Sequence, residues 1–362
     1  MSANKGVKMM FFDDRLDERK MKILRAIIND YIDTAEPIGS RTIARKHELG
    51  LSSATIRNEM ADLEDMGYLD QPHTSSGRIP SDKGYRLYVD HLMELSELTH
   101  EEIQSIKDAL EIKINELSQL IRQTSVVMSN ITKYTSIAIS PQLRRSTLKA
   151  VQVVPIAKGK ALVIVVVNAG VVRNMLVKIQ DSITPDQLIR ISNLLNEKLT
   201  GLNVEQINRS LIRDINKQMF IHNDTLMPIL DGVAECIEQI DNAEIFLDGT
   251  THIFNYPEFK DVEKARGFLN VLEKKKIVRE LLNDISNNEI NIHIGNENTI
   301  DEIKDCTLLT TTYNFGDMVV GSIGIIGPTR MDYSRVISAM NYIRKKMNIE
   351  INKLFGENVE DS

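Results

Sequence analysis

Hydrophobic residues in the first hundred positions recur with the spacing of short amphipathic helices. Over residues 18–34 they fall at i, i+3, i+4 and i+7, the pattern of a helix with one face on a core: Leu24, Ile27, Ile28 and Tyr31. A second, shorter helix is predicted over residues 41–49. Ser40 is expected to be its N-terminal cap, and Gly50 the left-handed residue that closes it.

A third helix follows the turn at residues 50–52, with Ser53 as its predicted cap. Its buried face is expected to consist of Ile56, Met60, Leu63 and Met66. Two short helices joined by a tight turn that contains glycine form a helix-turn-helix. Residues 68–71 and 78–80 then have the pattern of two short strands around a turn, and a further helix begins near residue 81. Three helices, a hairpin and a helix are the order of a winged helix.

The polar side chains at the start of the third helix form the candidate site. Because Ile56 points inward, Thr55, Arg57 and Asn58 are expected to face outward. This end of a helix carries the positive end of the dipole and unpaired N–H groups, which favour a phosphate. In the major groove of DNA, arginine pairs with guanine and asparagine with adenine. A solvated surface helix explains Arg57 and Asn58 equally well when they are taken alone.

The loop after the third helix strengthens the DNA-binding interpretation. Gly77 adds no bulk and Arg78 is attracted to a narrow minor groove, so the loop can approach DNA closely. Residues 38–58 hold four cations and one acid, although the whole chain has a net charge of −7. Phosphate contacts supply much of the affinity of DNA-binding proteins. The predicted DNA-binding residues are Ser40, Arg41, Thr42, Arg45, Ser53, Thr55, Arg57, Asn58, His73, Thr74, Ser75, Ser76, Gly77 and Arg78.

Several segments resemble the HrcA family of heat-inducible transcription repressors: EPIGSRTIA at 36–44, LSSATIRNEMADLEDMGYLDQPHTSSGRIPSDKGYRLYVD at 51–90, FNYPEF at 254–259 and GSIGIIGPTRMDYSRV at 321–336. The resemblance implies a winged-helix DNA-binding domain and a GAF-like domain that is split by an inserted dimerising domain. It also implies repression of chaperone operons through an inverted-repeat operator in double-stranded DNA, with release on heat stress. The chaperonin GroEL is the implied partner that assists the active state.

Residues 101–134 are predicted to form one long helix. Its apolar positions are spaced by about 3.5 residues, which is the heptad seam of a helix that pairs with another helix. A helix that lies on the sheet of its own domain is the alternative. We expect a helix that does both and ties the DNA-binding unit to a dimeric body. The predicted dimerisation residues are Ile103, Ile106, Leu110, Ile114, Leu117, Ile121, Met128 and Ile131.

The pattern then changes to that of strands. Two β-branched runs within residues 148–167 are separated by AKGK, and a third run follows at 171–179. Thr184 and Pro185 begin a helical stretch, and mostly helical patterns continue to about residue 243. The remaining elements are expected to be strands at 243–254, 290–295 and 306–327, with helices at 260–283 and 333–354.

This order predicts an α+β protein. A winged helix-turn-helix over 1–98 is joined by the long helix to a GAF-like domain over 99–184 and 246–362. A mostly helical inserted dimerising domain is expected over 185–245. The hydrophobic pattern predicts that helices interrupt the strands, whereas the resemblance implies the GAF-like fold and the dimerising role.

No pattern in the chain indicates an enzyme, a cofactor or a metal site. GSIGIIG lacks the spacing of dinucleotide-binding glycines and precedes a proline, so it is predicted to be a strand and its turn. The seven histidines do not pair at ligand spacing. Cys236 and Cys306 are expected to be buried thiols of a reducing cytoplasm. No apolar run is long enough to span a membrane, and no signal peptide is visible.

The sequence therefore predicts a cytoplasmic homodimer that binds DNA sequence-specifically, with no membrane contact. An enzyme or ligand sensor whose N-terminal unit contacts proteins is the alternative. Arg57, Asn58 and Arg78 favour DNA binding.

Overall fold

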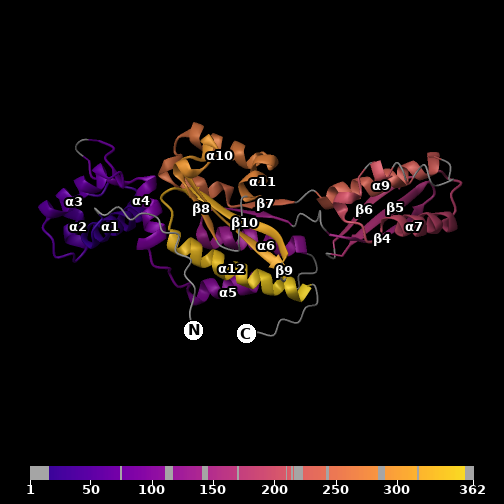
Figure 1. Ribbon diagram of the computed structural model, residues 1–362, viewed down its shortest axis with the longest axis horizontal. Helices are drawn as coiled ribbons and strands as arrows, with labels where there is room; N and C mark the ends of the chain where they lie inside the picture. Colours follow the sequence, from indigo (N-terminus) through magenta and orange to yellow (C-terminus); the bar gives the residue numbers. More distant parts are fainter. Residues whose placement is uncertain are drawn as a thin grey trace.

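The computed structural model describes residues 16–354, apart from 74–75, 111–116, 141–145, 169–170, 209, 213–214, 216–222, 242–243, 284–289 and 316–317. Figure 1 shows three units in a row: an N-terminal unit at the left, a central unit, and an inserted unit at the right. The N-terminal unit comprises residues 16–93, the central unit 94–140 and 244–354, and the inserted unit 146–241. The first two units share one hydrophobic core, whereas the inserted unit has a core of its own.

The N-terminal unit contains three helices, a two-stranded antiparallel sheet and a fourth helix that continues into a turn of π-helix. The first helix covers its predicted range, and the spacing correctly placed Leu24, Ile27 and Ile28 in the core. The elements are α1 (Glu18–Thr34), α2 (Ser40–Lys46), α3 (Ser53–Asp65), β1 (Leu69–Asp70), β2 (Ile79–Pro80), α4 (Asp82–Leu87) and η1 (Tyr88–Leu92).

Three predicted helix ends are wrong. Gly50 does not close the second helix, because α2 ends at Lys46 with His47 as its C-cap. Ser52, not Ser53, caps α3, because the Ser52 Oγ accepts a hydrogen bond from the backbone N–H of Thr55 at 3.1 Å. Gly39 is the residue that precedes α2, so Ser40 is the first helical residue and not the cap. Neighbouring hydroxyl residues give the same sequence signal, and the backbone conformation decides between them.

The central unit is built on a five-stranded sheet in the order β7-β3-β10-β9-β8, with every pairing antiparallel. Helices α5, α6 and α12 cover one face, and α10 and α11 cover the other. GSIGIIG lies in β10, as predicted. The strands are β3 (Thr135–Ile139), β7 (Ile245–Asp248), β8 (Asn291–Ile294), β9 (Cys306–Phe315) and β10 (Met318–Pro328). The helices are α5 (His100–Leu110), α6 (Leu117–Thr132), α10 (Val262–Glu273), α11 (Lys275–Asn283) and α12 (Tyr333–Leu354), with short 3-10 turns η4 (Thr250–Asn255), η5 (Pro257–Phe259), η6 (Gly295–Glu297) and η7 (Asp301–Ile303).

The long helix predicted over 101–134 is two helices in the structure. α5 and α6 lie side by side, which one continuous helix does not allow, and both pack on α12. The predicted dimerisation seam therefore faces the protein's own core: Ile106, Leu110, Ile121, Met128 and Ile131 are buried, Ile103 and Leu117 are half-buried, and Ile114 lies outside the described residues. An apolar stripe has the same spacing whether it covers a partner or its own domain, so periodicity could not distinguish the two.

The inserted unit begins earlier than predicted. Strands β4, β5 and β6 form a separate antiparallel sheet, and α7 and α9 cover one face of it. The border at residue 185 is therefore wrong, because the strands at 148–178 do not join the central sheet. The insertion is also less helical than predicted. Its elements are β4 (Leu148–Ala157), β5 (Lys160–Val167), β6 (Val172–Lys178), α7 (Pro185–Leu199), η3 (Val204–Gln206) and α9 (Asn223–Asp241).

Both cysteines are free and buried, as predicted. Cys236 lies in the core of the inserted unit, and burial raises the pKa of its thiol to about 11. Cys306 lies in the core of the central unit. Within the described ranges, no helix combines the length and the apolar character needed to cross a membrane.

Candidate nucleic-acid interface

The leading end of α3 exposes the two side chains that the sequence singled out. Ile56 is buried, which turns Arg57 and Asn58 to the surface. Neither side chain has a hydrogen bond or ion pair with any other residue that the structure describes. Thr55 is less available, since its hydroxyl lies 2.9 Å from the Ser52 Oγ within the cap. The free polar groups at this helix start are thus an arginine and an asparagine.

The neighbouring helix α2 adds further exposed polar groups. Arg41, Thr42 and Arg45 face solvent, whereas Ser40 is buried. The Arg45 Nε donates only a long hydrogen bond, of 3.4 Å, to the backbone carbonyl of Arg41. Three of the four predicted residues on α2 are therefore accessible to a ligand.

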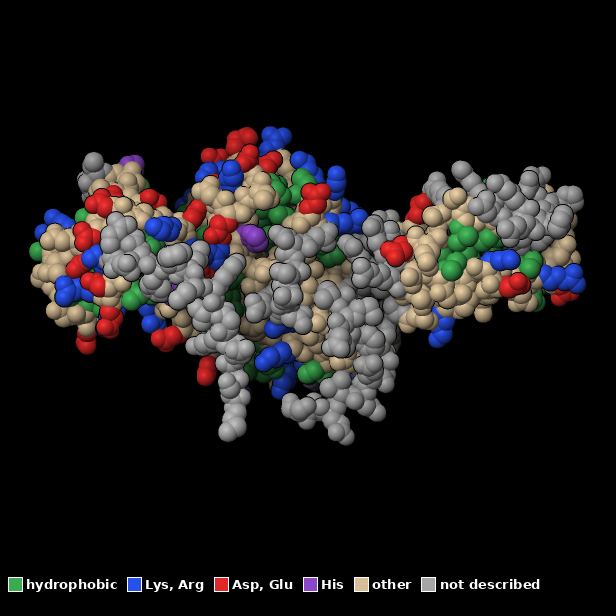
Figure 2. Space-filling view, viewed as in Figure 1, with side chains coloured by type: hydrophobic (Ala, Val, Ile, Leu, Met, Phe, Trp, Pro, Cys, Tyr) green, Lys and Arg blue, Asp and Glu red, His purple; other side chains and the backbone are tan. Residues whose placement is uncertain are grey.

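The exposed arginines of α2 and α3 differ from most other cations of the N-terminal unit, because they form no ion pair with a described residue. Figure 2 shows basic and acidic side chains interspersed over the visible face of this unit. Most cations in the described part of the N-terminal unit are paired, and examples are Lys20 with Glu59 at 2.7 Å, Lys46 with Asp30 at 2.6 Å and Arg25 with Glu94 at 3.0 Å. By contrast, Arg41, Arg45 and Arg57 form no ion pair with a described residue. Their charge remains available for an anion.

Lys20 and Lys46 are neutralised by acidic partners within the N-terminal unit. The hydrogen bond from Lys20 to Glu59 raises the pKa of the lysine, and the hydrogen bond from Lys46 to Asp30 does the same there. Asp30 is itself buried and also contacts the His47 Nε2 at 3.1 Å. These groups tie α1 to α2 and α3, so they hold the helices in place and are not free for an external phosphate.

One hollow of about 550 Å³ brings the predicted residues of three segments together. Arg41 and Arg57 line it from α2 and α3, and Ser76, Gly77 and Arg78 line it from the loop before β2. Sequence reasoning missed Gln71, which also lines the hollow and donates a hydrogen bond to the Ser76 carbonyl at 3.3 Å. No local pattern marks Gln71, because its place depends on how the loop folds back.

Arg78 lies at the base of the hairpin and not at its tip. Its backbone N–H and carbonyl both pair with Ile38, at 2.9 Å each. Its guanidinium forms an ion pair with Glu64 of α3 at 2.7 Å. Arg78 therefore connects the loop before α2, the hairpin and α3, a structural role that the sequence did not indicate.

Gly77 is required by the fold for a reason other than the predicted approach to DNA. A Cβ at this position would lie 2.4 Å from the backbone carbon and oxygen of Ile38. At the other side of the loop, His73 is exposed, and the Ser76 Oγ donates to the His73 carbonyl at 2.7 Å. Thr74 and Ser75 fall outside the described residues.

These features define a protein with unpaired arginines grouped on two adjacent helices, at one end of a larger α+β body. Comparisons with known proteins show the family of the chain. The family model for the HrcA protein C-terminal domain matches residues 118–337. A heat-inducible transcription repressor HrcA from Acetivibrio thermocellus is 59% identical over 346 residues, which cover 95% of this chain and 99% of the relative.

A second relative of the same name, from Ruminiclostridium cellulolyticum, is 60% identical over 94% of this chain and 98% of its own. The chain belongs to the HrcA family. A crystal structure described only as that of a hypothetical protein superimposes with a TM-score of 0.68. It is 22% identical and covers 94% of this chain and 100% of its own, so it shows the same fold.

The substitution Gly77→Ala should destabilise the N-terminal unit by about 1–3 kcal/mol, because the backbone of Ile38 cannot move aside as a flexible side chain would. Gly267→Ala in α10 is the matched control, since its nearest neighbour would be 3.7 Å away, and alanine should stabilise that helix by roughly 0.5–1 kcal/mol. Differential scanning calorimetry of both variants measures the two effects. Unfolding of Gly77→Ala at the wild-type temperature would contradict the argument.

Proposed function

We propose that this protein is a dimeric, sequence-specific repressor that binds an inverted-repeat operator of chaperone genes through a winged helix-turn-helix. The observation that carries the proposal is the pair Arg57 and Asn58, exposed and unpaired among the described residues at the capped start of α3. Family membership supports the heat-shock role, since the relatives are named heat-inducible transcription repressors.

In this proposal α3 enters the major groove with its N-terminal end leading. Arg57 and Asn58 then reach base edges, where each can make two hydrogen bonds to one base. Arg41 and Arg45 of α2 contact phosphates, which position the helix without reading sequence. The Arg78–Glu64 ion pair at 2.7 Å holds the hairpin against α3, so that both approach the duplex as one surface.

Replacing Arg57 or Asn58 by alanine should reduce operator specificity, each by about 1–3 kcal/mol, the usual worth of a good bidentate base contact. The measurement is a mobility shift with operator duplex and with a scrambled duplex of the same length. Arg122→Ala, which removes an exposed arginine from α6, is the matched control and should change neither affinity. Equal losses on both duplexes would mean that the two side chains contact only phosphate.

An inverted repeat presents two identical half-sites related by a two-fold axis, so the repressor must be two-fold as well. The structure turns the predicted seam of α5 and α6 inward, and the proposal therefore places the dimer interface on the inserted unit. There, the sheet face away from α7 and α9 carries apolar side chains on all three strands, together with the polar Gln152 and Asn174. Its exposed hydrophobic residues are Val154, Ile156, Val172 and Leu176, beside the half-buried Leu162, Ile164 and Val166 of β5.

Cross-strand pairing groups these side chains in two rows, and Ile164 of β5 connects the rows between Gln152 and Asn174. Leu162 of β5 lies opposite Val154 on one side and Leu176 on the other, and Val166 lies opposite Val172. A second copy of the chain is the occupant that suits this surface, because like faces pack on each other across a two-fold axis. The inserted unit of one copy would then rest on that of the other, with both N-terminal units free to reach DNA.

The substitution Leu176→Asp should raise the dimer dissociation constant by at least about tenfold, or 1.4 kcal/mol, because a carboxylate would enter an apolar interface. Ile189→Asp is the matched control: both residues are 56% exposed, but Ile189 lies on α7, on the covered side of the sheet. Sedimentation equilibrium of the two variants measures the difference. If both variants dimerise like the wild type, the interface lies elsewhere.

The proposal includes assistance by GroEL, which rests on family membership. Heat would loosen the repressor and free the operator, and the chaperonin would restore the binding-competent form. Operator binding after mild heating should therefore recover faster with GroEL and ATP than without them. Identical recovery in the two samples would remove the chaperonin from the mechanism.

A further inference from the structure

Residues 329–335, which run from the end of β10 into the first turn of α12, connect the N-terminal unit to the central unit. We call them the hub segment. Arg330 contacts the end of α1, Ser334 contacts the linker formed by residues 93–99, and Arg335 contacts α5. The Ser334 Oγ donates to the Glu94 carbonyl at 2.6 Å and accepts a hydrogen bond from the Ser96 N–H at 2.6 Å. A single short segment thus holds a helix, a linker and a second helix.

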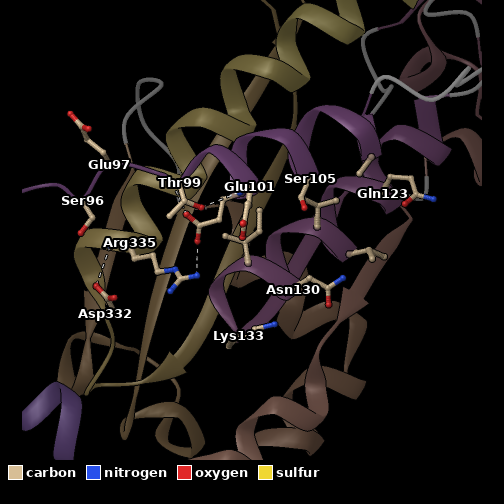
Figure 3. Close-up of a pocket in the computed structure, with 15 residues that line it drawn as sticks. Ser96, Glu97, Thr99, Glu101, Ser105, Gln123, Asn130, Lys133, Asp332 and Arg335 are labelled. Carbon is tan, nitrogen blue, oxygen red and sulfur yellow. Dashed lines mark hydrogen bonds and ion pairs between the residues drawn. The ribbon is translucent and has the colours of Figure 1, made fainter.

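Figure 3 shows the linker side of the hub segment. Arg335 extends from the start of α12 toward α5, where its guanidinium binds Glu102 at 2.5 Å, and Ser96 and Thr99 lie along the same wall. The backbone N–H of Thr99 also donates to Glu102, at 2.8 Å. The linker is therefore fixed to the central unit along its length and is not a free tether.

Arg330 is a buried link across the joint, with 9% of its surface exposed. Its Nε binds the carboxylate of Glu258 in η5 at 2.8 Å, and its Nη1 donates to the backbone carbonyl of Ile32 in the last turn of α1. Carbonyls in the last turn of a helix lack a partner within the helix, and a cation there also meets the negative end of the dipole. One guanidinium therefore joins α1 of the N-terminal unit to η5 of the central unit.

The joint contains polar groups that the described residues do not satisfy. The Oε2 of Glu258 and the hydroxyl of Tyr85 are both buried and, among described residues, accept or donate no hydrogen bond. Tyr85 of α4 packs on Tyr333 of the hub segment, with ring centroids 5.8 Å apart. A buried ion pair with unsatisfied neighbours adds little net stability, but removal of one partner leaves an uncompensated charge. Such a pair fixes the position of α1 relative to η5 more than it adds to the stability of the fold.

A second set of contacts holds the N-terminal unit through α4. The Arg86 guanidinium binds Glu297 and the Ile292 carbonyl, each at 2.5 Å. The Asp82 carboxylate accepts hydrogen bonds from the backbone and side chain of Asn296, both at 2.9 Å. With contacts at the end of α1 and along α4, the N-terminal unit has no single axis about which it can turn freely.

The joint leaves the candidate DNA-binding surface uncovered. The hollow lined by Arg41 and Arg57 lies on α2 and α3, and no described hydrogen bond or ion pair links these helices to the central unit. Docking of the N-terminal unit therefore does not mask its polar surface. It sets the direction in which that surface points relative to the body.

We propose that Arg330 is a positioning residue for operator binding: by joining the end of α1 to Glu258, it fixes the orientation of the N-terminal unit on the body. Two units held in fixed orientations that match the half-sites bind the second half-site at a higher effective concentration than loosely attached units do. This inference rests on the proposed function. It also gives a role to FNYPEF and GSIGIIGPTRMDYSRV, since Glu258 belongs to the first and Arg330 to the second.

The test compares full-length wild type with Arg330→Met on two duplexes. The operator probe is the duplex that the wild type selects from a pool of random sequences, and the half-site probe carries the same duplex with one half scrambled. Arg330→Met should weaken operator binding by at least about tenfold and change half-site binding by less than about twofold. It should also speed proteolytic cleavage within residues 93–99, because an N-terminal unit that is no longer held at the end of α1 would expose the linker more often. Lys304→Met, which removes the exposed ion pair with Asp301 in the same unit, should change none of these.

Glu258→Gln provides a second variant that keeps the size of the side chain and leaves the contact of Arg330 with Ile32 intact. It should shift the ratio of operator to half-site affinity in the same direction by a smaller factor. Unchanged operator affinity with an unchanged cleavage rate, tighter operator binding, or an equal loss on both duplexes would each overturn the inference. Should the wild type select no duplex, the proposed function fails, and the cleavage rate alone still decides whether Arg330 holds the joint.

Discussion

The antiparallel pairing of β3 with β7 and β10 is the constraint on which the arrangement of the three units depends. At one end of β3, Thr135 lies opposite Ile326, close to the hub segment and the joint with the N-terminal unit. At the other end, Ile139 lies opposite Ile245, where the chain leaves for the inserted unit and returns from it. A strand of five residues, roughly 17 Å long, therefore separates the two attachments. Figure 1 shows the result, with the outer units on opposite sides of the central sheet.

Local sequence patterns predicted those elements whose ends and faces are fixed by neighbouring residues. α1 and α12 have the predicted bounds, and the capping box of Thr184 and Gln187 starts α7 where the sequence indicated. The exposed positions of Arg57 and Asn58 also followed from the burial of Ile56 one residue earlier. In each case the contact that decides the end or the buried face of the helix lies within about one helical turn. The spacing of residues along the sequence therefore reveals it.

Contacts between distant residues were not predictable in the same way. Nothing in the strands at 148–178 shows that they pair with one another alone and pack on α7 and α9. The partner of Arg78 is Glu64, and the partners of Arg330 are Glu258 and Ile32, which lie far apart in sequence. Propensity and spacing describe one segment at a time, whereas sheet membership and ion pairing depend on which segments meet. The resemblance to a family indicated that 254–259 and 321–336 matter, but not that they touch.

The place where the insertion joins the central sheet has a consequence for how such a chain could arise. Ile139 and Ile245 are direct neighbours across two antiparallel strands, which is the geometry of the two ends of a hairpin turn. An ancestral chain with a short turn at this point would already contain the complete five-stranded order. Lengthening that turn into a folded unit breaks no strand pairing of the central sheet, so the sheet tolerates a large module at a position where a simpler protein needs only a few residues.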